Sequence, residues 1–228
     1  MGLTRPGRRH GLAARWERWR QDRHRRRLRR IRFNSGLGDS AWLLYGLVRS
    51  MKPEVCVEVG SARGKSACHI GLALAENDRG VLYAIDPHTP TAWSDDQSTD
   101  TWPIITRNLR RLGLEQRVRV VRQDSTAAAG DWREPIDLLF IDGDHSYEGV
   151  RRDWEAFSPF VKPSGVVVFH DTLWDLRPDE RWSRPDMGVP RLVEELRADG
   201  FPVLTIDEDY GVSVVQPVRN GRPLRPPA

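Results

Sequence analysis

Cysteine is scarce in this chain, and long apolar runs are missing from it. Cys56 and Cys68 are the only cysteines among 228 residues. Two cysteines are too few for a thiolate metal cage, and their apolar or helical surroundings indicate buried thiols in a reducing compartment. No apolar stretch approaches the roughly 18 residues that cross a bilayer. We therefore expect a cytoplasmic protein without a membrane-spanning helix.

The first residues lack two common targeting signals. The stretch MGLTRPGRRHGLAARW has no apolar core like that of a secretory signal. Pro6 stands where N-myristoylation requires Ser or Thr. An organellar transit peptide shares the arginine-rich composition of this region, so that reading stays open.

Acidic residues are nearly absent from residues 1–35, which we call the basic arm. Thirteen arginines face only Glu17 and Asp22 there, a local charge of +11, whereas the rest of the chain has 23 basic and 30 acidic residues and a charge of −7. The sequence pI of about 9.4 therefore reflects the arm. Residues 12–32 lack helix breakers and carry Trp16 and Trp19, which predicts a basic helix with a narrow apolar stripe.

Three roles for the basic arm are open. It can dock onto the acidic remainder of its own chain or of a partner subunit in a homo-oligomer. It can lie on an anionic membrane surface, as an arginine-rich face with tryptophans would allow. It can also bind nucleic acid through the phosphate backbone, although no residue pattern that reads bases is present.

Beyond the arm, short apolar runs alternate with helical patterns. Strands that are apolar along their whole length and alternate with helices are typical of a parallel sheet covered on both faces. The fold class that we expect is a doubly wound, Rossmann-like α/β domain with a mostly parallel seven-stranded sheet, which binds ligands at the carboxyl ends of its strands. The predicted strands are 55–59, 81–86, 118–124, 137–142 and 165–171, and the predicted helices are 40–51, one from about Arg63, 102–112, 147–160 and 189–199.

The end of the chain predicts a closing antiparallel hairpin. FPVLTI and YGVSVVQ are separated only by Asp207, Glu208 and Asp209. The domain is therefore predicted to span residues 36–217, preceded by the arm and followed by a disordered tail, 218–228. Asp39 or Ser40 is the predicted N-cap of the first helix of the domain.

Acidic side chains gather at the predicted strand ends. Because the carboxyl ends of parallel strands share one edge of the sheet, acids at these positions should meet. Five is more than chance should place there. They are Glu58, Asp86, Asp124, Asp142 and Asp171.

The first strand-to-helix turn, EVGSARGKSA, lacks two phosphate-binding signatures. The dinucleotide fingerprint Gly-x-Gly-x-x-Gly fails because residue 62 is Ala, which argues against a nicotinamide dehydrogenase. A Walker loop fails because no glycine stands five residues before Gly64. Gly60 and Gly64 still allow a ligand to approach the backbone and the start of the helix.

Glu58-x-Gly60-x-x-x-Gly64 followed by Asp86 resembles class I S-adenosylmethionine-dependent methyltransferases. The resemblance covers about residues 38–217. It implies that the turn holds the amino-acid part of S-adenosylmethionine and that Asp86 accepts the ribose hydroxyls. It also places the third strand end beside adenine. The implied cofactor-binding residues are Glu58, Gly60, Ser61, Gly64, Asp86, Asp124 and Ser125.

IDGDHSYEGV and VVVFHDT resemble the metal-assisted branch of this family, which methylates hydroxyls of sugars and natural products. The resemblance implies a divalent cation, with Mg²⁺ expected, held by Asp142, His170 and Asp171. His170 stands where that branch has Asp or Glu, and an imidazole lowers the expected affinity for Mg²⁺, which prefers oxygen.

His145 and Asp144 are the candidate catalytic bases. Related enzymes use a histidine three residues after the first metal ligand or an aspartate two residues after it. We favour His145 because an unperturbed imidazole titrates near neutrality. Alternatively, Asp144 or Ser146 caps the following helix. Asp153, inside that helix, is predicted to be a solvated residue.

Two long loops, 88–102 and 173–188, are candidate lids or binding loops over an acceptor. Their tryptophans offer flat faces suited to sugar or aromatic rings, although each one alone is as well explained by packing. These are Trp93, Trp102, Trp174 and Trp182.

The sequence therefore favours a methyltransferase that uses S-adenosylmethionine and a divalent cation to methylate a hydroxyl of a sugar or natural product. The alternative is a nucleic-acid or membrane-surface adaptor that binds through the basic arm on a degenerate Rossmann-like scaffold.

Overall fold

The computed structural model describes residues 22, 24–91, 93, 100–176 and 184–224. The chain divides into two units, Met1–Arg32 and Phe33–Ala228. Within the described part of the first unit, residues 24–28 are helical. Most of the predicted helix 12–32 lies outside the described residues, and the three roles of the arm stay predictions.

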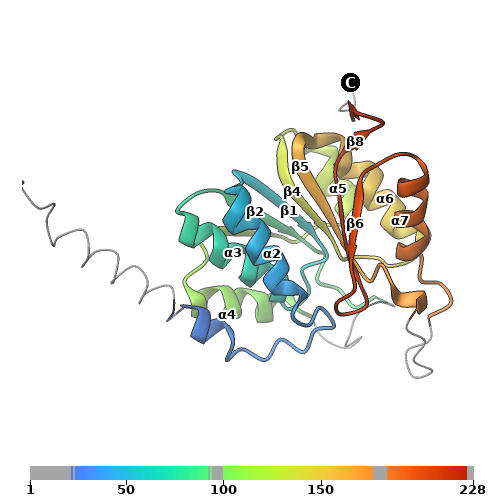
Figure 1. The fold of residues 1–228 in the computed structure, drawn as a ribbon. Coiled ribbons are helices and arrows are strands. Elements are labelled where there is room, and N and C mark those ends of the chain that lie inside the picture. The colour runs from blue at the N-terminus through green and yellow to red at the C-terminus, as the bar shows by residue number, and fades with distance from the viewer. Residues whose placement is uncertain (1–21, 23, 92, 94–99, 177–183, 225–228) are drawn as a thin grey trace, which may run out of the picture. The chain divides into compact units, whose positions relative to one another are not determined.

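The second unit is built on a seven-stranded sheet with the order β3-β2-β1-β4-β5-β7-β6 (Figure 1). Adjacent strands from β3 to β5 pair in parallel, whereas β7 pairs antiparallel with both β5 and β6. The strands are β1 (Val55–Val59), β2 (Val81–Ile85), β3 (Val118–Val121), β4 (Ile136–Ile141), β5 (Val161–His170), β6 (Val203–Ile206) and β7 (Val212–Val215). The predicted mostly parallel sheet and its closing hairpin are confirmed.

Helices cover both faces of this sheet. Figure 1 shows α2, α3 and α4 on one side, and α6 and α7 on the other, with α5 packed against α6. The bounds are α2 (Ser40–Met51), α3 (Lys65–Asn77), α4 (Trp102–Leu112), α5 (Ser125–Gly130), α6 (Tyr147–Phe157) and α7 (Val189–Ala198). Short 3₁₀ turns follow at η1 (Ser158–Phe160) and η2 (Trp174–Leu176).

Apolar residues on both faces of the strands explain why this sheet needs two helical layers. Leu138 and Leu139 are neighbours on β4, so their side chains point to opposite faces of the sheet, and both are fully buried. On α6, Trp154 packs with its ring centroid 5.9 Å from that of Phe169, so the helix closes one face of the core. Burial of such side chains is the main stabilising contribution to a fold of this class.

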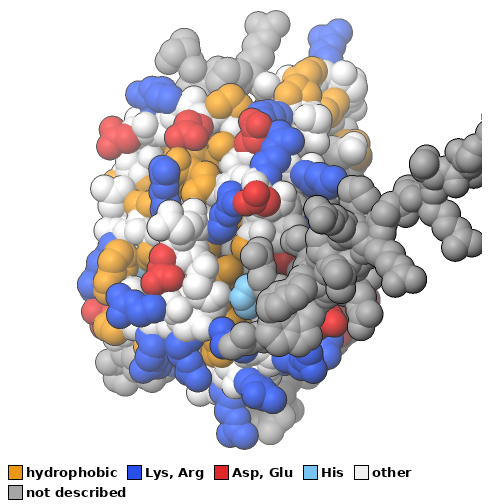
Figure 2. Space-filling model, turned by 90° about the vertical axis from the view of Figure 1, so that its left-hand side faces the viewer, with side chains coloured by type: hydrophobic (Ala, Val, Ile, Leu, Met, Phe, Trp, Pro, Cys, Tyr) orange, Lys and Arg blue, Asp and Glu red, His pale blue; other side chains and the backbone are white. Residues whose placement is uncertain are grey.

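Lys and Arg side chains are spread widely over the face shown in Figure 2, with Asp and Glu between them. This distribution differs from the concentrated positive charge of the basic arm. None of the described helices is long and apolar enough to cross a membrane.

One local expectation needs correction, and a second is confirmed in part. Residues 218–224, expected in a disordered tail, include the hairpin of β8 (Val218–Arg219) and β9 (Arg222–Pro223). It is anchored because the N–H of Asn220 donates to the oxygen of Gly200. Asp39 is the N-cap of α2 but makes no side-chain cap bond. The N–H of Ser40 instead donates to Oδ2 of Asp209, at 2.7 Å.

The strand order reverses between β1 and β4, which defines the place where a doubly wound sheet opens for ligands. β1 pairs with β2 on one side and with β4 on the other. In register, Val59 at the end of β1 lies beside Ile85 and Ile141. The polar residues that follow these three strands therefore emerge at one edge.

Candidate functional site

A cavity of about 760 Å³ opens at this edge of the sheet. Residues that follow β1, β2, β4 and β5 line it together with the segment 34–37 and the start of α5. Ten of the twelve predicted site residues are among those that line the cavity. The predicted site residues that line it are Gly60, Ser61, Asp86, Asp124, Ser125, Asp142, Asp144, His145, His170 and Asp171.

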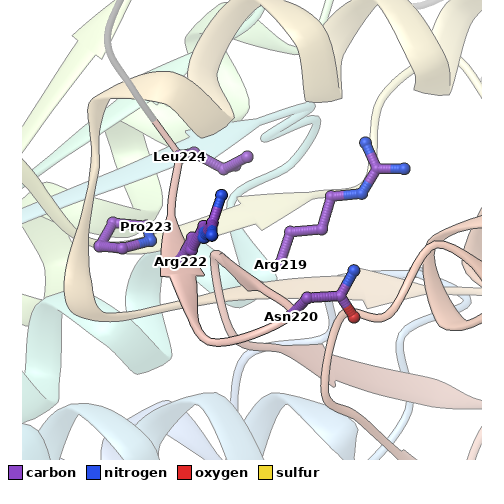
Figure 3. Close-up of a pocket in the computed structure, with 5 residues that line it drawn as sticks. All are labelled: Arg219, Asn220, Arg222, Pro223 and Leu224. Atoms are coloured by element: carbon purple, nitrogen blue, oxygen red, sulfur yellow. The ribbon is translucent and has the colours of Figure 1, made fainter.

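A second hollow, of about 490 Å³, lies at the β8–β9 hairpin (Figure 3). A single short segment lines it, consisting of Arg219, Asn220, Arg222, Pro223 and Leu224. These residues offer neither a carboxylate nor an imidazole for catalysis. The chemistry is therefore to be sought in the larger cavity.

The glycine turn after β1 is held by Asp86. Its Oδ2 accepts the backbone N–H groups of Ser61, at 2.9 Å, and Ala62, at 2.8 Å. Its Oδ1 accepts the N–H of His88 at 2.6 Å. The carboxylate thus fixes the turn and also lines the cavity.

Gly60 allows β1 and β4 to approach each other at the cavity. Its φ is +86°, and a Cβ atom added there would lie 2.2 Å from the backbone oxygen of Asp142. No side chain fits that space, and the left-handed conformation also favours glycine. The first predicted metal ligand is therefore brought next to the turn by the absence of a side chain.

Glu58 and Gly64 are not among the residues that line the cavity, so their predicted cofactor contacts stay predictions. Glu58 is fully buried and accepts a hydrogen bond from the Ser66 hydroxyl. Burial raises the pKa of Glu58 to about 8. Gly64 has φ +83°, and a Cβ atom there would lie 2.6 Å from Cγ1 of Ile105 in α4. Its lack of a side chain serves helix packing.

The third strand end meets the cavity through Asp124 and Ser125. Asp124 caps α5, since its Oδ1 accepts the N–H of Thr126 at 2.9 Å. The Ser125 hydroxyl donates to Oδ1 of Asp153 at 2.6 Å. Asp153, expected to be solvated, is only 3% exposed and lines the cavity. That expectation was wrong, because α6 turns Asp153 inward with Trp154.

Asp142, His145, His170 and Asp171, which we call the Asp–His cluster, converge at the ends of β4 and β5. Because Ile141 and Phe169 are in register, Asp142 follows β4 beside the last residue of β5, His170. Nδ1 of His170 lies 3.2 Å from Oδ1 of Asp142. Nε2 of His145 lies 3.4 Å from that same oxygen and 2.9 Å from Oδ2 of Asp171.

Asp171 has an uncommon backbone conformation, with φ +60°. A non-glycine residue in the left-handed region is strained, and such strain is frequent at functional sites. Here it occurs directly after β5, where the Asp171 carboxylate turns toward His145. The Asp171 side chain is 9% exposed.

The two imidazoles carry perturbed pKa values. Burial alone would lower the pKa of His145, but its hydrogen bonds to Asp142 and Asp171 outweigh burial and raise that pKa to about 10. Burial also lowers the pKa of His170, but the negative charge of Asp142 outweighs burial and raises that pKa to about 10. Despite burial, the imidazoles lower the pKa of both carboxyl groups.

The donor atoms of the Asp–His cluster fit a divalent cation. Each side chain offers one ligand atom, and these four atoms all lie within 4.8 Å of one another. Within the described residues, Nε2 of His170 and Oδ1 of Asp171 are buried without a hydrogen-bond partner. Two imidazoles and two carboxylates suit transition metals better than Mg²⁺. The choice of Mg²⁺ stays a prediction.

Asp144 lies outside the Asp–His cluster. Its Oδ1 accepts the N–H of Ser146 at 2.9 Å, and its Oδ2 lies 3.8 Å from Arg152. The Asp144 side chain is 45% exposed. Ser146, rather than Asp144, caps α6 by accepting the N–H of Gly149 at 3.1 Å. Asp144 therefore stabilises the turn before the cap and borders the cavity.

Aromatic residues line the remaining walls of the cavity. Trp93 lies 5.3 Å from His145 between ring centroids, and the Arg184 guanidinium lies 3.6 Å from the Trp93 centroid. Trp174 stacks on Tyr210 at 4.6 Å. Trp102 is not among the lining residues. Trp182 and parts of both long loops lie outside the described residues.

A family model described as "Methyltransferase domain" matches residues 57–172, from β1 to just beyond the Asp–His cluster. The chain belongs to this methyltransferase family. The match contains the glycine turn, Asp86 and the whole cluster, so the family assignment and the cavity involve the same residues.

Individual relatives of this methyltransferase-family chain are distant. The uncharacterized protein y4gI of Sinorhizobium fredii is 29% identical over 172 residues, which are 66% of this chain and 18% of that protein. The chain thus spans less than a fifth of the length of this curated relative.

Two solved structures share the fold. The SAH-bound methyltransferase PaMTH1 of Podospora anserina has a TM-score of 0.63 and 15% identity, covering 95% of this chain and 99% of that chain. An O-methyltransferase of Bacillus cereus, in complex with SAH, has a TM-score of 0.56 and 17% identity, covering 78% and 81%. These likenesses confirm the Rossmann-like methyltransferase fold.

Proposed function

We propose that this chain transfers a methyl group from S-adenosylmethionine to a hydroxyl oxygen of a small molecule, with assistance from a divalent cation. One observation carries the proposal: the glycine turn held by Asp86 and the Asp–His cluster line the same cavity. A donor site and a site that can activate an alcohol are therefore adjacent. The family assignment supports methyl transfer as the reaction class.

The donor half of the cavity offers polar groups that suit a nucleoside. Oδ2 of Asp86 already accepts two backbone N–H groups, whereas Oδ1 accepts one and has a further lone pair for a ribose hydroxyl. Gly60 leaves the backbone accessible, while Ser125 borders the place expected for the base. The SAH complexes of the Podospora and Bacillus proteins agree with a donor of this kind.

The reaction requires a nucleophile aligned with the methyl group. The hydroxyl oxygen attacks the methyl carbon, the bond between that carbon and sulfur breaks, and S-adenosylhomocysteine leaves while the hydroxyl proton passes to a base. When bound, a divalent cation supplies positive charge that lowers the pKa of the acceptor hydroxyl. Asp142, His170 and Asp171 would hold it. Its positive charge would lower the pKa of His145 from the raised value that these carboxylates give it, so that neutral His145 would accept the proton at Nε2.

His145 is also close enough to be a fourth cation ligand, since its Nε2 lies 2.9 Å from Oδ2 of Asp171. The two roles separate in one variant. If His145 acts as the base, His145→Ala lowers turnover about 100-fold or more and leaves cation affinity near that of the parent. If His145 is a cation ligand, the same substitution lowers both turnover and cation affinity. Asp144→Asn is the matched comparison, because Asp144 borders the cavity outside the cluster.

The acceptor class that we favour is a sugar or a glycosylated natural product. The resemblance to sugar O-methyltransferases supports it, as do the rings of Trp93, Trp174 and Tyr210 in the cavity wall. Flat aromatic faces suit the apolar faces of sugar rings as well as aromatic acceptors. The hydroxyl lies, under this proposal, between these rings and His145.

The direct test is calorimetric titration of the full chain with S-adenosylmethionine and S-adenosylhomocysteine. We expect saturable binding of both, followed by cofactor-dependent methylation within a panel of sugar-bearing small molecules. A chelator should suppress methylation, and added divalent cation should restore it. Folded protein that binds neither ligand would refute the proposal. Undiminished activity in chelator would refute only the role of the divalent cation.

A further inference from the structure

Residues 34–40, which we call the strap, lie beside the cavity and have no part in the reaction described above. Residues 34–37 of the strap line the cavity together with the glycine turn. Arg63, which belongs to that turn, holds the start of the strap, because its guanidinium donates to the backbone oxygen of Asn34 at 2.8 Å. The strap is therefore attached to the donor half of the cavity.

The end of the strap is attached to a different part of the chain. The N–H of Ser40 donates to Oδ2 of Asp209 at 2.7 Å, and Asp209 belongs to residues 207–211, the turn between β6 and β7. Gly38 makes room for this contact, since a Cβ atom added there would collide with the Asp209 carboxylate. An alanine at this position would push the carboxylate away from the strap.

The β6–β7 turn also forms part of the acceptor wall. Tyr210 directly follows Asp209 and lines the cavity, where its ring stacks on that of Trp174 with the centroids 4.6 Å apart. The backbone oxygen of Tyr210 accepts the N–H of Leu173 at 2.8 Å. Leu173 is only two residues after Asp171 of the Asp–His cluster. A shift of this turn would therefore move the aromatic rings that we assign to the acceptor.

The β6–β7 turn has a strained backbone. Asp209 has φ +46° and Tyr210 has φ +67°, so two successive residues other than glycine adopt the left-handed conformation. Such conformations persist only where the surrounding contacts hold them. The hydrogen bond from Ser40 is one of these contacts, and it acts on the first of the two strained residues. Loss of this bond should allow the turn to relax and the Tyr210 ring to move.

We propose that Asp209 is a positioning residue that couples the two halves of the cavity: through its hydrogen bond with Ser40, a donor bound beside the strap orders the wall of Tyr210 and Trp174. The inference rests on the proposed function, which assigns the donor to the glycine turn. A donor that packs against residues 34–37 stabilises the strap, and the strap then holds Asp209 in its strained conformation. Because such coupling is reciprocal, an acceptor bound at these rings also favours binding of the donor.

Hydrogen–deuterium exchange of the full chain, with and without S-adenosylhomocysteine at a saturating concentration, measures this coupling. Exchange is followed in the strap and in residues 171–176, which contain Leu173 and Trp174. In the parent, the ligand should slow amide exchange about fivefold or more in both segments. In Asp209→Ala the ligand should still slow exchange in the strap. In residues 171–176 the slowing should fall below about twofold, because the connection between the two segments is lost.

Two further variants separate the hydrogen bond from charge and from general loosening of the turn. Asp209→Asn keeps an oxygen that accepts the Ser40 N–H and removes the negative charge that acts on Lys65. Glu208→Ala shortens an exposed side chain of the same turn. Both variants should retain the ligand-dependent slowing in residues 171–176. Its loss in either variant would overturn the inference, because charge or the stability of the whole turn would then explain the effect.

Gly38→Ala provides a second way to break the contact if Asp209→Ala does not fold, and it should have the same effect on exchange. The inference is overturned if the bound ligand leaves exchange in residues 171–176 of the parent unchanged, or if the slowing survives in both disrupting variants. Either result leaves the proposed function intact. Absence of S-adenosylhomocysteine binding to the folded parent overturns the proposed function and the inference together.

Discussion

Replacing Glu58 with glutamine should remove one component of the pH dependence of folding. Glu58 lies in β1 with a fully buried side chain, and burial raises its pKa from 4.5 to about 8. Between these values the native state holds a proton that the unfolded chain has lost. Stability from this group is fully present below pH 4.5 and is lost as the pH rises through about 8.

The magnitude follows from linkage. A difference of one bound proton changes the free energy of unfolding by about 1.4 kcal/mol per pH unit. The parent should therefore lose stability relative to Glu58→Gln at close to this rate within the window. The absolute stability of the variant also changes, because the Ser66 hydroxyl then meets an amide instead of a carboxyl group. The pKa of Glu58 is therefore tested by the difference between the two pH slopes of the free energy of unfolding, and the constant difference in stability is not used.

Urea unfolding of both chains from pH 5 to 8, followed by circular dichroism, measures the slopes. Glu54→Gln is the control, because the Glu54 side chain is 62% exposed and pairs with Arg79 at the surface. Its slope should match that of the parent. Parallel curves for the parent and Glu58→Gln would show that Glu58 titrates normally and would refute the reasoning from burial.

Three further changes have defined outcomes. Gly60→Ala should cost about 1–3 kcal/mol from backbone strain and steric conflict with the oxygen of Asp142, measured by urea unfolding, and weaken S-adenosylhomocysteine binding in calorimetry. Trp154→Ala should cost about 3–5 kcal/mol, because the Trp154 ring packs against Phe169 in the core, and a loss below 1 kcal/mol would contradict that packing. His170→Asp should raise Mg²⁺ affinity by about tenfold, since it supplies an oxygen ligand, and calorimetry that finds weaker Mg²⁺ binding would contradict the assigned role.

The strands and helices of the domain could be predicted because their patterns are local. Residues 55–59 form β1 and 102–112 form α4, as the apolar runs and helical spacing indicate. The six-residue α5 escaped prediction because STAAAG is too short to show a helical period. Its capping by Asp124 becomes clear only when the Thr126 N–H is seen to reach that carboxylate.

Asp153 shows a signal that was present in the sequence but interpreted wrongly. Val150, Asp153, Trp154 and Phe157 recur at helical spacing, and all four are buried. The apolar face of α6 therefore includes position 153. An acid on such a face was assigned to solvent because charged residues are almost never fully buried without a partner. The partner, Ser125, is 28 residues away in the chain.

By itself, the sequence determined the class of sheet and the edge at which its acids gather, because parallel strands that alternate with helices end on the same side. Only the tertiary structure decided which side chains meet. The separation of His170 and Asp142 depends on the register between β4 and β5, and the position of Asp142 beside the turn depends on the close approach at Gly60. The number of residues between two positions does not determine how far apart they lie on different strands, because hydrogen bonding and packing between the strands determine that distance.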